Sequence, residues 1–152
     1  MVQMAKTTNI YTYPVDLKYV NSVVEATSSG SHSGPYEGSV DFAVPIDTSV
    51  FAAEKGIVRR VRDDSSKYGN TQIYGNDANY ITIEHANDEL SEYLHLAKDS
   101  ALVKVGDKVK SGQAIAKTGL SGWLHAPHLH FMVYIKTSDT VNFQCMKIKF
   151  RK

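Results

Sequence analysis

The clearest pattern in the chain runs from residue 128 to residue 135, where large apolar side chains recur at every second position. A period of two predicts a β-strand, because successive side chains of a strand point to opposite faces. One face of this strand carries Leu129, Phe131, Val133 and Ile135. The other face carries His128, His130, Met132 and Tyr134. We therefore predict a strand that packs one face on a core and presents two imidazoles on the other.

Several shorter segments show the same alternation. In residues 40–44, Val40, Phe42 and Val44 share one face, and Asp41 lies on the opposite one. Residues 50–53 and 57–62 flank a Lys-Gly turn and predict a hairpin. Residues 80–85 predict another strand, and residues 89–96 its return strand, with Tyr93 and His95 on the face opposite Leu90, Leu94 and Leu96.

No segment has the pattern of an amphipathic helix of normal length. The sequence therefore predicts an all-β fold of antiparallel sheets, packed as a sandwich or half-open barrel with a central groove. We expect a single domain over residues 31–152, with residues 1–30 as an N-terminal arm packed on it. The polar stretch 63–77 is predicted to be a long surface loop, where Tyr68 and Tyr74 are candidates for contact with a substrate.

Composition and charge exclude some classes of partner. The net charge of +1 gives no electrostatic argument for binding nucleic acid or an anionic membrane. No apolar stretch approaches the roughly 18 residues that a membrane-spanning helix needs. The N-terminal residues contain no continuous apolar segment, so no secretory signal is visible. The single cysteine, Cys145, forms no internal disulfide and is expected to be a small buried residue.

The candidate chemistry comes from polar residues that interrupt otherwise ordinary strands. Asp41, His95 and the His128/His130 pair lie on three different predicted strands, and His32 precedes the first of them. If these strands are neighbours, their side chains line one groove. A catalytic zinc ion takes three imidazole or carboxylate ligands and a water molecule, whose pKa falls to about 7. Spacing alone leaves open which histidines bind a metal and which catalyse, and imidazole also suits copper, iron and nickel.

Several motifs in the same order resemble the lysostaphin-like, or LytM-type, zinc endopeptidases. They are residues 40–45 (VDFAVP), 93–96 (YLHL), 103–113 (VKVGDKVKSGQ) and 127–131 (PHLHF). The resemblance covers about residues 31 to 136. It implies one Zn²⁺ ion held by His32, Asp41 and His130, with His95 and His128 as the catalytic pair. It also implies a protein of the extracellular space or cell envelope that hydrolyses peptidoglycan peptides, often at glycine or D-alanine. We expect the protein to be a monomer.

Two positions depart from the pattern of that family. His32 lies nine residues before Asp41, whereas many members have four, and Glu37 is the other possible ligand nearby. Met132 stands where glutamate is common, which concerns the groove rather than the metal. For substrate contact, Tyr93 and His125 join the two loop tyrosines as candidates.

Two other functions remain as alternatives. One is a non-catalytic LytM-like module that regulates a cell-wall amidase. Such modules have lost site residues, whereas all five positions are filled here. The other is a phosphocarrier or lipoyl-like carrier, because related β folds share a turn like residues 105–113 and some carriers use two facing histidines. Such a carrier would need neither His32 nor Asp41.

Overall fold

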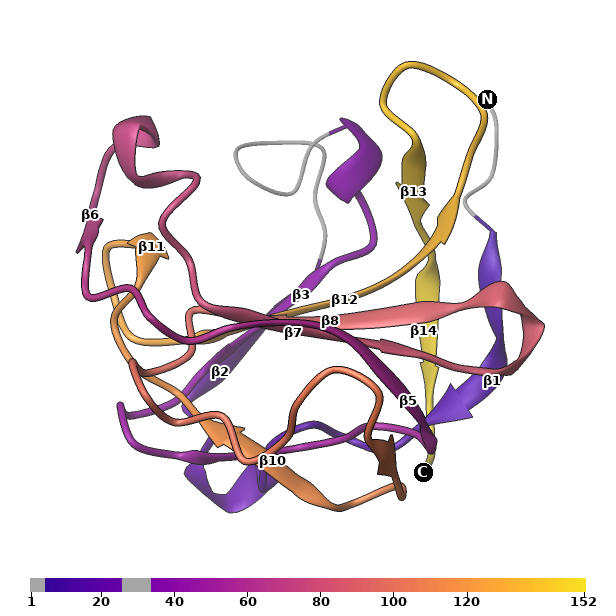
Figure 1. The fold of residues 1–152 in the computed structure, drawn as a ribbon, viewed down its shortest axis with the longest axis horizontal. Coiled ribbons are helices and arrows are strands. Elements are labelled where there is room, and N and C mark those ends of the chain that lie inside the picture. The colour runs from indigo at the N-terminus through magenta and orange to yellow at the C-terminus, as the bar shows by residue number, and fades with distance from the viewer. Residues whose placement is uncertain (1–4, 26–33) are drawn as a thin grey trace.

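A computed structural model describes residues 5–25 and 34–152, and its regular elements there are β-strands and single 3₁₀ turns (Figure 1). The prediction of an all-β fold with antiparallel sheets is confirmed. The strands are β1 (Lys6–Tyr11), β2 (Ser22–Glu25), β3 (Val40–Ala43), β4 (Ser49–Phe51), β5 (Gly56–Arg62), β6 (Tyr68–Gly69), β7 (Tyr80–Glu84), β8 (Leu90–Leu94), β9 (Lys108–Val109), β10 (Ala114–Lys117), β11 (Gly122–Trp123), β12 (Leu129–Lys136), β13 (Phe143–Cys145) and β14 (Lys147–Phe150). The 3₁₀ turns are η1 (Leu17–Tyr19), η3 (Gly34–Tyr36), η4 (Gln72–Tyr74) and η5 (Ala86–Asp88).

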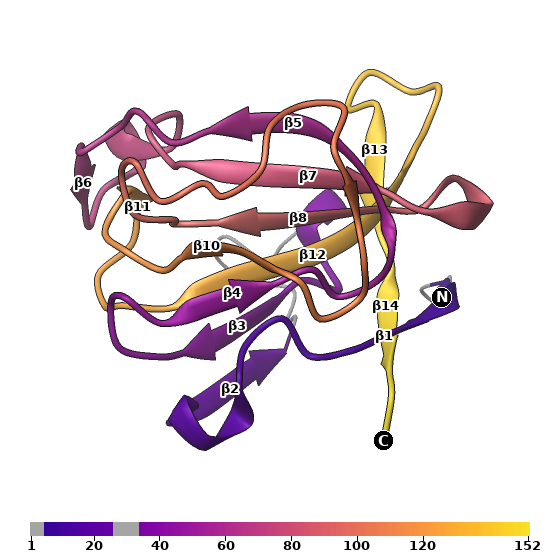
Figure 2. The same cartoon turned by 60° about the horizontal axis from the view of Figure 1, so that its bottom comes forward.

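One large antiparallel sheet forms the body of the molecule, in the order β2-β3-β12-β8-β7-β5-β9, with β13 also paired to β12. The two-stranded sheet of β4 and β10 lies against one face of it (Figure 2). The core lies between these layers, where Val50 and Ile115 of the small sheet join Phe42, Ile81 and Phe131 of the large one. All five side chains are fully buried. Burial of this apolar face is the main source of stability.

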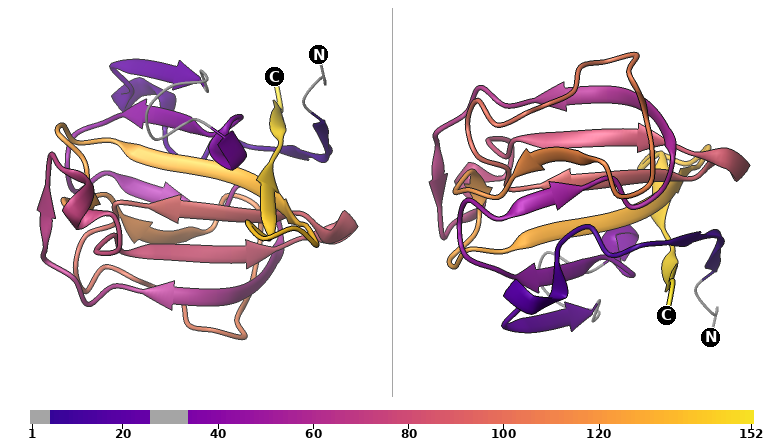
Figure 3. Two further views of the ribbon diagram at one scale, coloured as in Figure 1. Left: turned by 90° about the horizontal axis from the view of Figure 1, so that it is seen from above. Right: turned by 90° about the horizontal axis from the view of Figure 1, so that it is seen from below.

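The other face of the large sheet carries loops, 3₁₀ turns and the short strand β6, rather than a second full sheet (Figure 3). Figure 1 shows η3 and the segment of β6 and η4 on the side of the central strands opposite β10. We call this side the open face. In β12 the predicted alternation is confirmed, because Leu129, Phe131 and Val133 belong to the main core. Met132 and Tyr134 form a smaller cluster on the open face.

The predicted hairpin over residues 50–62 is wrong, although both of its strands exist. β4 pairs with β10, and β5 pairs with β7 and β9. Gly56 gives the reason for this pairing. A Cβ atom at Gly56 would collide with the backbone carbonyl of Glu84. The chain therefore enters β5 tight against β7, and β4 remains in the other layer.

The N-terminal segment joins the sheets at two places. β1 pairs with β14 in parallel, and β2 pairs with β3. The buried carboxylate of Glu89 accepts hydrogen bonds from the backbone of Thr8 and Asn9 and from the Tyr11 hydroxyl, at 2.6, 3.2 and 2.9 Å. The boundary predicted between residues 30 and 31 lies outside the described residues. In the described ranges, no helix has the length and apolar character needed to cross a membrane.

Candidate metal centre

Asp41 and His130 face each other across two neighbouring strands. β3 and β12 are antiparallel and set Asp41 directly opposite His130. Because Val40 and Phe42 point into the core, Asp41 points to the open face. The His130 Nδ1 atom lies 2.9 Å from Asp41 Oδ1. The alternation in the sequence therefore brings an imidazole and a carboxylate from residues far apart into direct contact.

His128 completes a row of polar groups at the start of β12. Its Nε2 atom lies 3.7 Å from Asp41 Oδ2. Its Nδ1 atom lies 2.9 Å from the carbonyl oxygen of Ala126, which can only accept, so Nδ1 carries the proton. Burial lowers the pKa of His128. The neutral ring therefore keeps a lone pair on Nε2, on the side of Asp41.

His95 reaches the same place by a break in its strand. It follows β8 and has a φ angle of +67°, in the left-handed region that is uncommon for residues other than glycine. This conformation turns the ring towards His128, with ring centroids 4.6 Å apart. The Nδ1–H group donates to the Ser121 carbonyl oxygen at 2.7 Å. Burial, followed by the neighbouring imidazoles, lowers the pKa of His95 to about 3, so the ring is neutral at pH 7.

Tyr93 lies in the core and not on the side of the groove, contrary to the prediction for residues 89–96. Tyr93 is paired with Phe131 and lies in the core, whereas Leu90 and Leu94 lie on the open face. Tyr93 is fully buried, and its hydroxyl accepts from the Ala53 N–H and from the Ser91 hydroxyl, both at 2.9 Å. The prediction that Tyr93 contacts a substrate is therefore wrong. Strict alternation also predicted His95 on the same face as Tyr93. The left-handed φ angle of His95 turns its ring to the open face instead.

A pocket of about 570 Å³ opens beside these histidines. It is lined by Gly34, Pro35, Tyr36, Gln72, Gly75, Asn76, Ala78, Leu94, His95, Trp123 and His130. Among the residues that the sequence suggested for substrate contact, Tyr68, Tyr74 and His125 are absent from this lining. Tyr74 packs its ring against Gly69 instead, and Tyr68 and His125 are exposed elsewhere.

Trp123 and Tyr36 are lining residues that the sequence analysis missed. Trp123 is 40% exposed and is the single tryptophan of the chain, in the loop that leads to the His128/His130 strand. A single tryptophan next to the predicted histidine strand could have been predicted from the sequence as a pocket residue. Asn79 was also missed. It is fully buried, and its side chain holds Ser65 and the carbonyl oxygen of Leu96, next to His95.

The donor chemistry at this site suits a zinc ion. A carboxylate and two imidazoles within 4 Å of it are the ligand types that zinc takes in proteins. Within residues 5–25 and 34–152, no set of three or more His, Cys, Asp or Glu side chains is arranged to hold a metal ion. The third predicted ligand, His32, lies outside the described residues. The structure thus brings Asp41 and His130, two of the three predicted ligands, into contact.

Comparison with known proteins identifies the family of the chain. The sequence model of Peptidase family M23 matches residues 35–143, which is most of the chain. The chain belongs to peptidase family M23. The LytM-type resemblance seen in the motifs is therefore confirmed at the level of the family. The M23 match contains Asp41, His95, His128 and His130, whereas His32 precedes it.

Curated and solved relatives extend the comparison. The chain is 36% identical over 102 residues to the peptidoglycan DD-endopeptidase ShyA of Vibrio cholerae, covering 67% of this chain and 21% of ShyA. A zinc-containing peptidase from V. cholerae has a TM-score of 0.60 at 36% identity, over 82% of this chain and 36% of that one. The catalytic domain of lysostaphin from Staphylococcus simulans has a TM-score of 0.60 at 25% identity. The match covers 86% of this chain and 94% of that domain. The chain spans only 21% to 27% of the length of the first curated relatives.

Proposed function

We propose that this M23 chain is a zinc-dependent endopeptidase that hydrolyses peptide bonds in the stem or cross-bridge peptides of peptidoglycan. In this proposal His32, Asp41 and His130 hold one Zn²⁺ ion, and His95 and His128 are the catalytic pair. The observation that carries the proposal is the row His130–Asp41–His128, together with the ring of His95, which lies edge-to-face beside His128. The names of the relatives, a peptidoglycan DD-endopeptidase and a zinc-containing peptidase, support the substrate and the metal.

The bound zinc ion would supply a Lewis acid that lowers the pKa of a water molecule and polarises the peptide carbonyl. The protein contributes proton transfer. His95 holds its proton on Nδ1 against the Ser121 carbonyl, so Nε2 is the atom that accepts a proton from the attacking water. His128 is held in the same way by the Ala126 carbonyl. Once either Nε2 atom is protonated, it becomes a donor that stabilises the oxyanion.

The pocket next to His95 and His130 is the proposed binding place for the peptide near the scissile bond. Trp123 and Tyr36 offer apolar surface there, and Gln72 and Asn76 offer amides that can pair with a peptide backbone. A substrate of this kind places the active protein outside the cell or in the envelope. A monomer suffices for this proposal, because all the proposed catalytic groups come from one chain.

The decisive experiment compares the zinc-loaded chain with an Asp41→Ala variant on several purified peptidoglycans. Released fragments are identified by mass spectrometry, and bound zinc is measured by atomic absorption. We expect cleavage by the parent chain, and loss of both zinc and cleavage in Asp41→Ala. Asp64→Ala is the matched control and should keep both properties, because Asp64 is an exposed carboxylate whose ion-pair partner among the described residues is Arg62. A folded, zinc-loaded chain that releases no peptide fragment would overturn the proposal and favour the regulatory module.

A further inference from the structure

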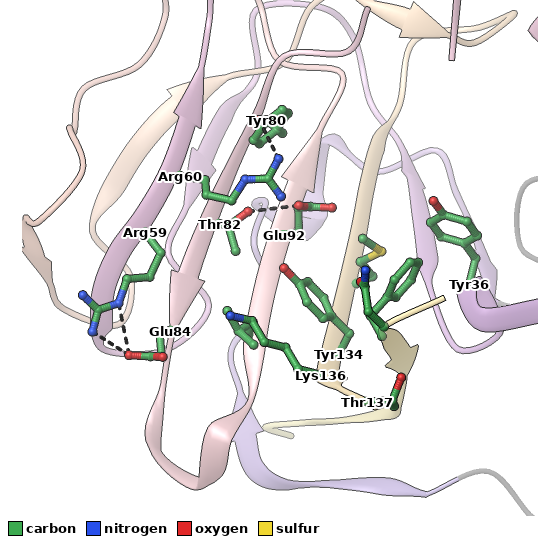
Figure 4. A pocket seen from close by; sticks show the side chains of 14 residues that line it. Tyr36, Arg59, Arg60, Tyr80, Thr82, Glu84, Glu92, Tyr134, Lys136 and Thr137 are labelled. Atoms are coloured by element: carbon green, nitrogen blue, oxygen red, sulfur yellow. Dashed lines mark hydrogen bonds and ion pairs between the residues drawn. The ribbon is translucent and has the colours of Figure 1, made fainter. Parts of the chain in front are cut away.

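A second and larger pocket, of about 850 Å³, lies on the same open face (Figure 4). The two pockets adjoin, because Tyr36 lines both of them. Along β12 and β8, the pair Met132 and Glu92 follows the pair His130 and Leu94 after two residues. Two residues of a strand span about 7 Å, which is also the length of about two residues of an extended peptide. A peptide that is cleaved beside His130 and extends along β12 would therefore place a residue close to the scissile bond over the second pocket.

The floor of this pocket contains a buried carboxylate with spare capacity for hydrogen bonds. Glu92 is only 8% exposed, and its Oε1 accepts from the Thr82 hydroxyl at 3.0 Å. Within the described part of the chain, no residue donates a hydrogen bond to its Oε2. Burial raises the pKa of Glu92, because the charged form loses its hydration there. A ligand that brings a positive charge would offset this cost.

The rim of the pocket carries positive charge. Arg60 lies over the Tyr80 ring and donates from Nη2 to its hydroxyl at 2.8 Å. Neither Arg60 nor the exposed Lys136 forms an ion pair with a described residue, whereas Arg59 is paired with Glu84 at 2.7 Å. Figure 4 shows Arg60 of β5 and Glu92 of β8 pointing into the same cavity, and β7 lies between these two strands. The pocket thus presents an acceptor for a cation on its floor and donors for an anion above it.

The remaining wall is apolar. The apolar residues that line the pocket are Leu90, Met132, Tyr134 and Phe143. Such a wall suits the methylene groups of a long side chain. A glycine residue has no side chain to fill 850 Å³, so a polyglycine cross-bridge would leave these groups without partners.

We propose that this second pocket binds a long substrate side chain that ends in an α-amino acid group, as in diaminopimelate. The ammonium group of that side chain pairs with Glu92, its carboxylate pairs with Arg60 and Lys136, and its methylenes lie against Met132 and Tyr134. The inference rests on the proposed function, since it names the class of peptidoglycan peptide that the same groove receives. It makes Arg60 and Lys136 determinants of specificity for diaminopimelate-type over lysine-type stem peptides, and Glu92 a determinant against glycine peptides.

The test measures binding, so that it does not depend on hydrolysis. The full chain with Asp41→Ala is titrated by calorimetry with two soluble stem tripeptides, one ending in diaminopimelate and one in lysine. We expect the diaminopimelate peptide to bind at least about tenfold more tightly, because it alone makes the charged contacts at the rim. We expect the methyl signal of Met132 to shift in NMR spectra on titration.

Two added substitutions locate the effect. Glu92→Gln keeps an acceptor for Thr82 and removes the charge, and Arg60→Gln acts at the rim without touching the buried floor. Each substitution should lower the affinity for the diaminopimelate peptide at least about tenfold. Glu25→Gln, on the exposed edge strand β2, should leave that affinity unchanged. Thermal melts of every variant check folding, and the rim variant keeps the test decisive if Glu92→Gln unfolds.

Equal affinity for the two peptides, or no loss of affinity in folded Glu92→Gln and Arg60→Gln, would overturn the inference. The proposed catalytic function is judged separately. If the zinc-loaded parent chain binds the diaminopimelate peptide but cleaves no peptidoglycan, the pocket assignment stands and the peptidase proposal fails.

Discussion

Two buried histidines follow neighbouring strands of the same sheet and differ in the use of one ring nitrogen. His85 follows β7 and His95 follows β8, and they are 6% and 7% exposed. Burial lowers the pKa of both, and in both the Nδ1 atom lies 2.7 Å from a backbone carbonyl oxygen. The Nε2 atom of His85 lies 2.7 Å from the Ser91 hydroxyl. The Nε2 atom of His95 has no hydrogen-bond partner among the described residues.

This difference separates a structural histidine from a candidate catalyst. Every polar atom of the His85 ring is used inside the protein, and the ring packs against Tyr11 at 5.4 Å. The ring of His95 lines the pocket and lies beside two more histidines. Burial and a lowered pKa are therefore shared by both residues. The nitrogen that remains available to a ligand distinguishes them.

The largest expected effect is on catalysis at His95. His95→Ala should lower kcat/KM by a factor of about 10² to 10⁴, the usual contribution of a general acid or base. The measurement is initial-rate kinetics on the peptidoglycan fragment that the parent chain cleaves fastest, with zinc content and melting temperature recorded alongside. His85→Ala is the matched control, and its folded fraction should keep the parent kcat/KM. Equal losses in the two variants would remove the distinction.

The pH dependence of stability tests what the two histidines share. Both pKa values are lowered in the folded state, so the unfolded chain binds more protons below its ordinary histidine pKa of about 6.5. The contribution of these histidines to the free energy of unfolding is therefore fully present above that pH. Below it, the free energy of unfolding falls by about 1.4 kcal/mol per pH unit for each histidine that stays neutral in the folded chain. Denaturant unfolding of the zinc-free chain between pH 7.5 and pH 5 measures this slope. His95→Gln should flatten it, and an unchanged slope would contradict the assignment for His95.

A smaller effect is expected when His85 is removed. His85→Ala leaves the Lys55 carbonyl and the Ser91 hydroxyl without their imidazole partner, and it empties the space beside Tyr11. We expect a loss of about 2–3 kcal/mol in the free energy of unfolding, from one buried hydrogen-bond pair and lost packing. Urea denaturation at pH 7.5 measures it. The exposed His125→Ala should change stability by less than about 0.5 kcal/mol, and a similar loss there would argue against this account.

Local patterns predicted the strands well but not their partners. The alternation in residues 40–44 and 128–135 was enough to put Asp41 and His130 on the face opposite the core, because each pattern is decided by burial of its own strand. The partner of β4 was predicted wrongly. β5 packs closely on β7 at Gly56 and Glu84, residues that meet only in the folded sheet.

By itself, the sequence determined the all-β class, the apolar faces of the strands and the kinds of residue available for a metal site, since these depend on side-chain chemistry and a period of two. Tertiary structure alone decided that the ring of His95 turns to the open face, through one left-handed φ angle that no alternation reveals. It also decided that Glu92 lies beneath Arg60 in a pocket next to that site. Such arrangements arise from pairings between distant strands, whose geometry no single segment of the chain contains.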